Sequence, residues 1–192
     1  MQPDTKTTLL DIAENAARSR GFDGFSYADL AEAAGIRKAS IHYHFATKSV
    51  LSAALMDRYH ATVKQVCADI DATGRHAADR LAALIAFYRA ALGGGETLYL
   101  CVAFTISRDS LADDVKDKIV KFRSMMTAWM TTVFELGRQD GTIPAIEAPQ
   151  LEAHATLAML EGAHLAAHAE SDIAAFDKAT RLLSVRCGFA VS

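Results

Sequence analysis

Side chains that can bind DNA are concentrated in one short segment, residues 33–50, which contains no Asp or Glu. Basic, hydroxyl and imidazole groups donate hydrogen bonds to phosphate oxygens and to base edges in the major groove. Lys48 stands near the expected start of a helix, where an ammonium and free backbone N–H groups together suit a phosphate. The segment therefore indicates contact with nucleic acid, although the net charge of the chain is only −3. An exposed basic pair such as Arg37 and Lys38 also promotes solubility. The DNA-binding interpretation therefore depends on which helices carry these side chains.

A second set of side chains suits a small ligand. It combines aromatic rings, a thioether and a thiol with few polar groups, as in pockets for small apolar or aromatic molecules. No Lys or Arg belongs to the set, so a highly anionic ligand would lack compensation for its buried charge. The alternative is that these residues form ordinary core. The predicted ligand-binding residues are Tyr88, Cys101, Phe104, Met125, Trp129 and His164.

Cysteine and histidine spacing does not predict a metal site or any other cofactor. Cys67, Cys101 and Cys187 share no CxxC or CxxH spacing, so they are expected to be free thiols. Cys101 is either an inert buried thiol or a sensor that electrophiles modify. His164 and His168 are four residues apart, on one helical face, but a third strong ligand is missing. They are expected to line the ligand pocket or the dimer seam, or to be ordinary partly buried histidines.

Enzyme activity is not expected, because the 192 residues contain no GxSxG, GxGxxG or P-loop motif. No apolar run is long enough to span a bilayer, and the N-terminus has no apolar signal core. We therefore expect a cytoplasmic protein that does not enter membranes.

The segment that could bind DNA lies where two short helices follow a longer one. The first helix is predicted from residue 4 or 5 to residue 20, the second from residue 27 to residue 34, and the third from residue 37 to residue 45. Ser26 can cap the second helix, and Gly35 can supply the tight turn. Ile41 and Phe45 can anchor the third helix to the core. This is a helix-turn-helix arrangement, whose outer face would carry Arg37, Lys38, Ser40, Tyr43 and His44.

The rest of the chain is predicted to be helical as well. Alanine pairs recur and only three prolines occur, so we expect an all-α fold of about nine helices. Residues 1–47 would form a three-helix domain that contains the helix-turn-helix, and residues 48–192 a second helical domain, to which the family resemblance given below assigns ligand binding and dimerisation. The further helices are expected at residues 48–72, 76–92, 98–106, 112–139, 149–170 and 172–189.

Residues 21–51 resemble the TetR family of bacterial transcriptional regulators. The matching positions are Gly21-Phe22, Ser26, Asp29-Leu30-Ala31, Ala34-Gly35-Ile36, His44-Phe45, Lys48 and Leu51. Two departures from the family pattern are Phe25, where a Thr is usual, and His42, where a Tyr is usual. The resemblance implies a homodimer in which ligand binding changes the separation of two recognition helices and releases operator DNA. It also adds Ser26, Tyr27 and His42 to the predicted DNA contacts.

The sequence thus predicts a repressor that releases its operator on binding a small apolar or aromatic inducer, with a reactive electrophile as the alternative inducer. The competing hypothesis is an all-helical small-molecule binding protein that does not bind DNA. The dimer is expected to be a symmetric four-helix interface formed by the last two helices. Their apolar residues are Leu157, Leu160, Leu165, Ile173, Phe176, Leu182, Leu183 and Val185.

Overall fold

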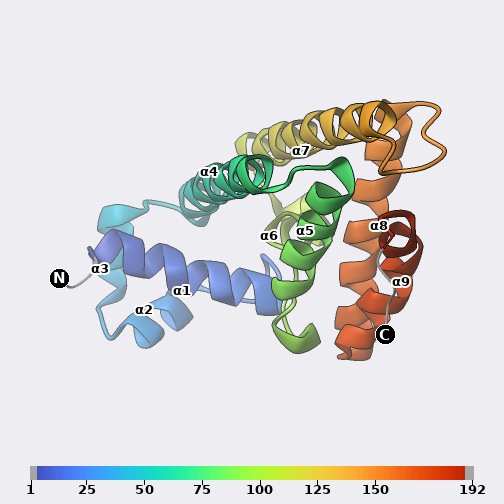
Figure 1. Cartoon of the computed structure of the whole chain (residues 1–192). Coiled ribbons are helices and arrows are strands. Elements are labelled where there is room, and N and C mark those ends of the chain that lie inside the picture. The colour runs from blue at the N-terminus through green and yellow to red at the C-terminus, as the bar shows by residue number, and fades with distance from the viewer. Residues whose placement is uncertain (1–3, 189–192) are drawn as a thin grey trace. The chain divides into compact units, whose positions relative to one another are not determined.

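A computed structural model describes residues 4–188, and within this range the chain forms nine α-helices and two short 3-10 helices without strands (Figure 1). The predicted all-α fold is confirmed. The predicted last helix extended to Phe189, which lies outside the described residues. In chain order the elements are α1 (Thr5–Arg20), α2 (Tyr27–Ala34), α3 (Lys38–His44), α4 (Lys48–Thr73), α5 (Ala77–Ala90), η1 (Gly93–Gly95), α6 (Leu100–Ile106), η2 (Arg108–Ser110), α7 (Asp113–Asp140), α8 (Pro149–Glu170) and α9 (Ile173–Arg186).

Local chemistry explains where the first helices begin and end. Ser26 and Asp29 form a reciprocal capping box at the start of α2, as the sequence predicted. Gly35 ends α2 in the left-handed conformation, with φ of 64°, which glycine adopts without a steric penalty. Arg37 was expected to start the next helix but is its extended N-cap, with ψ of 145°. The local signals therefore place the two short helices to within a residue.

The apolar segment predicted to be a helix at residues 98–106 forms the helix α6. Residues 100–104 of α6 are all buried, so their continuous apolar character comes from burial on every side. The triple glycine that precedes it forms the short 3-10 turn η1. Gly95 has φ of 108°, and a Cβ there would lie 3.0 Å from the backbone nitrogen of Asp172. Glycine is therefore required where η1 approaches the connection between α8 and α9.

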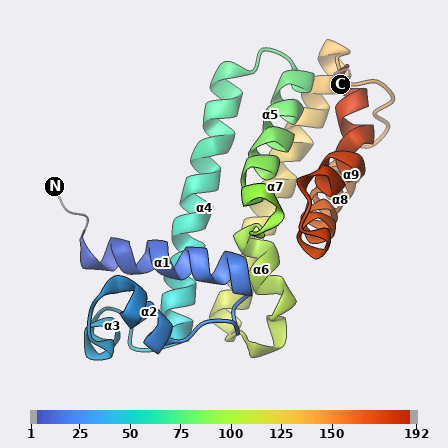
Figure 2. The same cartoon turned by 90° about the horizontal axis from the view of Figure 1, so that it is seen from below.

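The first of two compact units consists of Met1–Ala61 and Leu100–Lys121. In it α1 packs against α2 and α6, and α2 packs against α3. Figure 2 shows α1 crossing the first half of α4, where Arg58 pairs with Asp11 at 2.7 Å and with Glu14 at 2.6 Å. The helix-turn-helix pair therefore rests on α1, which the start of α4 and α6 support. A functional boundary between residues 47 and 48 stays a prediction.

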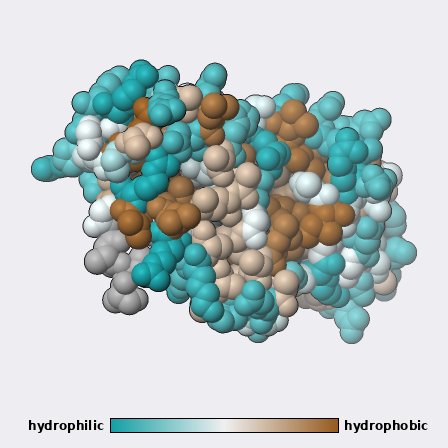
Figure 3. Space-filling view, turned by 90° about the vertical axis from the view of Figure 1, so that its right-hand side faces the viewer, coloured by the Kyte–Doolittle hydropathy of each residue, from teal (hydrophilic) through white to brown (hydrophobic). Residues whose placement is uncertain are grey.

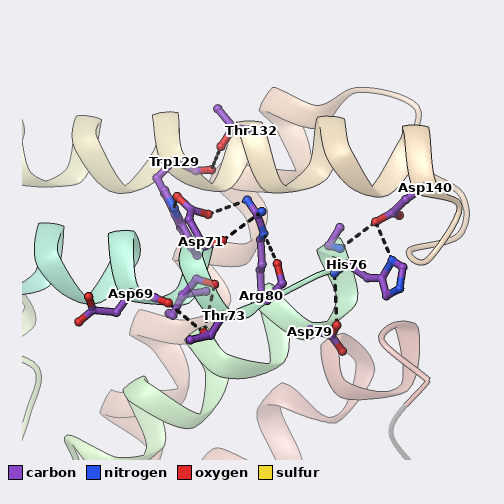
Figure 4. Close-up of polar contacts among 12 residues, drawn as sticks. Asp69, Asp71, Thr73, His76, Asp79, Arg80, Trp129, Thr132 and Asp140 are labelled. Carbon is purple, nitrogen blue, oxygen red and sulfur yellow. Dashed lines mark hydrogen bonds and ion pairs between the residues drawn. The ribbon is translucent and has the colours of Figure 1, made fainter.

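The second unit consists of Thr62–Tyr99 and Phe122–Ser192. In its described part α8 and α9 pack as a hairpin, and α5 packs against both. Asp71, near the end of α4, joins two other helices (Figure 4). Its carboxylate accepts hydrogen bonds from Arg80 of α5 at 2.7 Å and from the Trp129 indole of α7 at 3.0 Å. This junction fixes the last turns of α4 within the unit.

Half of the apolar residues predicted for the dimer interface are core of the protomer itself. Leu157, Leu160, Phe176 and Leu183 are at most 3% exposed, because α8 and α9 pack against each other and against α5. Their assignment to an interface between protomers is therefore wrong. The exposed apolar residues of the two helices are Leu151, Leu165, Leu182 and Val185.

No helix within residues 4–188 combines the length and apolar character needed to cross a bilayer.

Candidate nucleic-acid interface

The turn between α2 and α3 determines which face of α3 points outward. The backbone N–H of Gly35 donates to Glu32, and that of Ile36 donates to Ala31, so the turn is tightly closed. Ile41 and Phe45 are buried at 0% and 1% exposure, as predicted. Since they are four residues apart on one side of α3, the opposite side is left exposed.

The exposed side of α3 carries the basic and aromatic residues that the sequence predicted there. Arg37 and Lys38 are exposed, and the Tyr43 side chain is 86% exposed. Ser40 and His44 are half-buried. A shallow hollow of about 560 Å³ runs along this side. Its lining residues are Thr5, Ile36, Arg37, Ala39, Ser40, Tyr43 and His44.

A second open hollow, of about 320 Å³, lies beside the start of α2. Five of its lining residues belong to the predicted DNA-binding set, and they come from segments up to 22 positions apart that the fold brings together. Thr47 was missed as a candidate for this surface. The signal was its place before α4, where its hydroxyl accepts the Val50 N–H at 3.2 Å and caps the helix. The lining residues are Phe25, Ser26, Tyr27, Lys38, His42, Thr47 and Lys48.

Two members of the predicted set have functional groups engaged within the fold. The Ser26 hydroxyl accepts the Asp29 N–H at 3.4 Å, and the Asp29 carboxylate accepts the Ser26 N–H at 2.6 Å. The hydrogen bonds that the Ser26 backbone and side chain give to the carboxylate lower the pKa of Asp29, since they favour its charged form. Tyr27 is buried and donates its hydroxyl to the Phe45 carbonyl at 3.0 Å. Burial raises the pKa of Tyr27 to about 12. Their DNA contacts stay predictions, and the structure gives both side chains a role in holding α2.

His42 is exposed and lines the hollow beside the start of α2. Its Nδ1 is 3.2 Å from the Ala46 carbonyl, which only accepts, so Nδ1 carries a proton and donates. The ring lies against that of Tyr27, with centroids 4.9 Å apart. The predicted contact of His42 with DNA stays a prediction.

Lys48 does not extend into solvent as a simple phosphate clamp would. Its ammonium donates to the Phe25 carbonyl at 2.6 Å and lies 4.4 Å from the centre of the Phe22 ring and 4.2 Å from that of Phe25. Burial lowers its pKa, and the charges of Asp23 and Asp29 partly oppose that shift. Its predicted contact with phosphate stays untested.

The predicted ligand-binding residues divide between the two units. Tyr88 and His164 are fully buried in the second unit, where the Tyr88 and Tyr99 rings stack at 4.4 Å. His164 Nδ1 accepts the Tyr99 N–H at 3.2 Å, so Nε2 carries the proton and donates to the Tyr88 carbonyl at 2.9 Å. Both imidazole nitrogens are thus bonded to the protein backbone, and Phe176 packs edge-on against the ring.

The other members of the ligand set have different surroundings. Met125 and Trp129 are half-buried on α7, and the indole N–H of Trp129 is bonded to Asp71 (Figure 4). Cys101 and Phe104 are fully buried in the first unit. There Phe104 packs edge-on against Phe22, with centroids 5.9 Å apart.

The paired histidines of α8 are also engaged by the backbone. His168 Nδ1 lies 3.2 Å from the Gly95 carbonyl, so this imidazole ties α8 to η1. Across the described part of the chain, no three His, Cys, Asp or Glu side chains come together as a metal site would require.

A capped helix, a closed glycine turn and a short helix with an exposed polar face define a helix-turn-helix protein. Residues 6–55 match the sequence profile described as "Bacterial regulatory proteins, tetR family". The HTH-type transcriptional repressor NemR of Escherichia coli K12 is 25% identical over 170 residues, which cover 85% of this chain and 84% of NemR. The regulator TtgR of Pseudomonas putida is 37% identical over 59 residues, 31% of this chain and 28% of TtgR.

The likeness extends to the tertiary structure. A TetR family transcriptional regulator from Agrobacterium tumefaciens superposes with a TM-score of 0.89 and 26% identity, over 95% of this chain and 96% of that chain. The profile match over residues 6–55, the relatives and this structure together support a TetR family transcriptional regulator.

Proposed function

We propose that the protein represses transcription by binding operator DNA through α3 and releases it when a small molecule binds. The observation that carries the proposal is the exposed, acid-free side of α3, which Ile41 and Phe45 hold outward. Arg37 and Lys38 would contact phosphates or guanine edges, and Tyr43 would reach into the major groove. Ser40, His42 and His44 flank them, and Ser26 and Tyr27 would approach the backbone from the start of α2.

Fluorescence anisotropy with a labelled duplex from the gene's upstream region tests this proposal. Binding should weaken steeply between about 50 and 200 mM salt, since each neutralised phosphate contributes about −0.9 to the slope of log K against log salt. A random duplex of equal length is the control, and it should bind far more weakly. Undetectable binding even at low salt would contradict DNA recognition and favour the competing class, a helical small-molecule binding protein.

A dimer would present two such helices to successive turns of the duplex. Its proposed interface is the outer face of α8 and α9, where Leu151, Leu165, Leu182 and Val185 are between 42% and 71% exposed. Figure 3, viewed from the side where these helices lie, shows brown apolar areas among teal polar ones. Exposed apolar surface of this kind marks contact sites. Two-fold symmetry would place the pair of recognition helices on matching half-sites about 34–36 Å apart.

Sedimentation of a variant distinguishes this interface from incidental exposure. Leu182→Glu should shift the protein to monomers at micromolar concentration and weaken operator binding. Val120→Glu is the matched control, since Val120 is 61% exposed on α7 and belongs to neither α8 nor α9. A wild-type chain that sediments as a monomer would rule the dimer out.

The inducer is proposed to be a small, largely apolar or aromatic molecule bound among Tyr88, Met125, Trp129 and His164, with Cys101 and Phe104 as further candidates. The support is the aromatic character of these side chains, together with the ligand-dependent behaviour that the family implies. A thermal-shift screen would find it, because a ligand at 100 times its Kd stabilises the folded state by about 2.7 kcal/mol. Trp129→Phe should then lower the affinity for the compound found, and an unchanged affinity would contradict the placement.

An electrophilic inducer acting at Cys101 is the sharper variant of this proposal. Burial raises the pKa of Cys67 to about 12 and that of Cys187 to about 11, so those thiols stay protonated and unreactive. Cys101 is also fully buried, so an electrophile would reach its thiol only after a local opening of α6. Cys101→Ser separates the two variants. If electrophiles still release DNA from Cys101→Ser at similar concentrations, Cys101 is not the sensor.

A further inference from the structure

The ammonium of Lys48 lies in a cage made by the connection between α1 and α2. Phe22 and Phe25 place ring faces 4.4 and 4.2 Å from it, and the Phe25 carbonyl accepts its hydrogen bond at 2.6 Å. Cations over aromatic faces at these distances are attracted by the ring quadrupole. Two rings and a carbonyl thus occupy three sides of the Lys48 ammonium. A lysine that binds phosphate would need those sides open to the ligand.

The cage connects three elements of the first unit to the end of α3. Lys48 begins α4, and Phe104 of α6 packs edge-on against Phe22. Tyr27 follows Phe25 by two residues, and its hydroxyl donates to the carbonyl of Phe45, the residue that ends α3. A displacement of the segment around Phe25 would therefore shift the start of α2 and the end of α3 together.

We propose that Lys48 is a positioning residue for DNA recognition: its caged ammonium fixes residues 21–26 against α4 and thereby sets the orientation of α3. The inference rests on the proposed DNA-binding function. A positioning lysine and a phosphate-binding lysine affect different properties of DNA binding. Loss of a phosphate ligand weakens binding to all sequences alike, whereas misplacement of α3 weakens binding only where base edges are read.

Lys48→Met tests the proposal, because it keeps an apolar stem beside the rings but removes the ammonium. Lys64→Met, at an exposed position of the same helix, is the matched control. Operator and random duplexes should be titrated over a range of salt, at a temperature well below the unfolding midpoints. The unfolding midpoint of the DNA-free protein should be measured in parallel.

We expect Lys48→Met to lower the unfolding midpoint and to weaken operator binding about tenfold, while random-duplex affinity and the salt slope stay as in wild type. Lys48→Arg should restore operator binding, since a guanidinium also stacks on aromatic rings. Lys64→Met should change none of these quantities.

Equal weakening on both duplexes, with a salt slope smaller by about 0.9, would identify a phosphate ligand and overturn the proposal. An unchanged unfolding midpoint would overturn it too. If Lys48→Met does not fold, Phe22→Leu replaces it: this change alters the cage without removing charge and must reduce operator discrimination in the same way. If the wild-type chain binds neither duplex, the proposed function fails, and the unfolding midpoints still decide whether the cage exists.

Discussion

The outer side of α3 and the aromatic cluster around His164 use polar side chains in opposite ways. On α3, Arg37, Lys38 and Tyr43 point away from the core. Around His164, both ring nitrogens already bond to backbone atoms of Tyr99 and Tyr88. The polar groups of His164 thus stabilise the fold, and they are already occupied by backbone partners. The proposed DNA-binding surface is thus exposed on a rigid support, whereas a ligand would have to open a closed aromatic cluster in the second unit.

Removing the imidazole of His164 should have the largest effect. His164→Ala takes away the acceptor of the Tyr99 N–H and the donor to the Tyr88 carbonyl, and leaves a cavity among aromatic rings. We expect the free energy of unfolding to fall by about 3 kcal/mol in urea titrations. His154→Ala, at an exposed position of the same helix, should stay within about 0.5 kcal/mol of wild type. A loss below about 1 kcal/mol for His164→Ala would remove the contrast with α3.

On α3 the expected pattern is reversed, with binding lost and stability kept. Arg37→Ala and Lys38→Ala should each weaken operator binding about tenfold, which is about 1.4 kcal/mol, and reduce the salt slope by about 0.9. Their urea midpoints should match that of wild type because both side chains are exposed. Arg75→Ala removes an exposed cation from the second unit and should leave DNA affinity unchanged. Equal losses in all three variants would indicate only a general charge effect.

Trp129→Phe should have a smaller effect on stability than His164→Ala. An aromatic ring remains, but Asp71 loses the hydrogen bond from the indole at 3.0 Å and keeps the one from Arg80. A loss of about 1 kcal/mol is expected, as for a typical hydrogen bond, from urea titrations followed by circular dichroism. Met125→Leu, on the same helix, controls for repacking. A neutral result for Trp129→Phe would show that the junction in Figure 4 contributes little to the second unit.

The smallest effect is expected at the capping box of α2. The folded-state pKa of Asp29 lies below its ordinary value of 3.8, so its stabilisation is fully present above about pH 4 and is lost as the pH falls through the lowered pKa. Asp29→Asn should therefore melt below wild type at pH 7, and the gap should narrow at lower pH. Glu32→Gln controls for the removal of a charge from α2. A gap that does not change with pH would contradict the role of the ionised carboxylate.

Features that depend on interactions between residues close in the sequence could be predicted, whereas features that depend on distant contacts could not. The Ser26–Asp29 box, the Gly35 turn and the Ile41–Phe45 anchor involve neighbours within five residues, and the structure confirms all three. The surroundings of Lys48 and Phe104 depend on Phe22, which lies 26 and 82 positions away from them in the sequence. Leucines of α8 and α9 were assigned to a dimer because helical spacing alone does not show which apolar face the protomer buries. Thr47 was missed as a lining residue, because the hollow forms from segments that lie far apart in the sequence.

The first unit is assembled from two separate stretches of chain, Met1–Ala61 and Leu100–Lys121. During synthesis, α1, α2 and α3 leave the ribosome well before α6, which contributes Phe104 to the packing of Phe22. At about 5–20 residues per second, that interval lasts several seconds. The first unit is therefore incomplete in the nascent chain at a stage when the whole helix-turn-helix segment has already been synthesised. An expressed fragment that ends near Ala61 would remain in that unfinished state, with Phe22 exposed to water and to other chains.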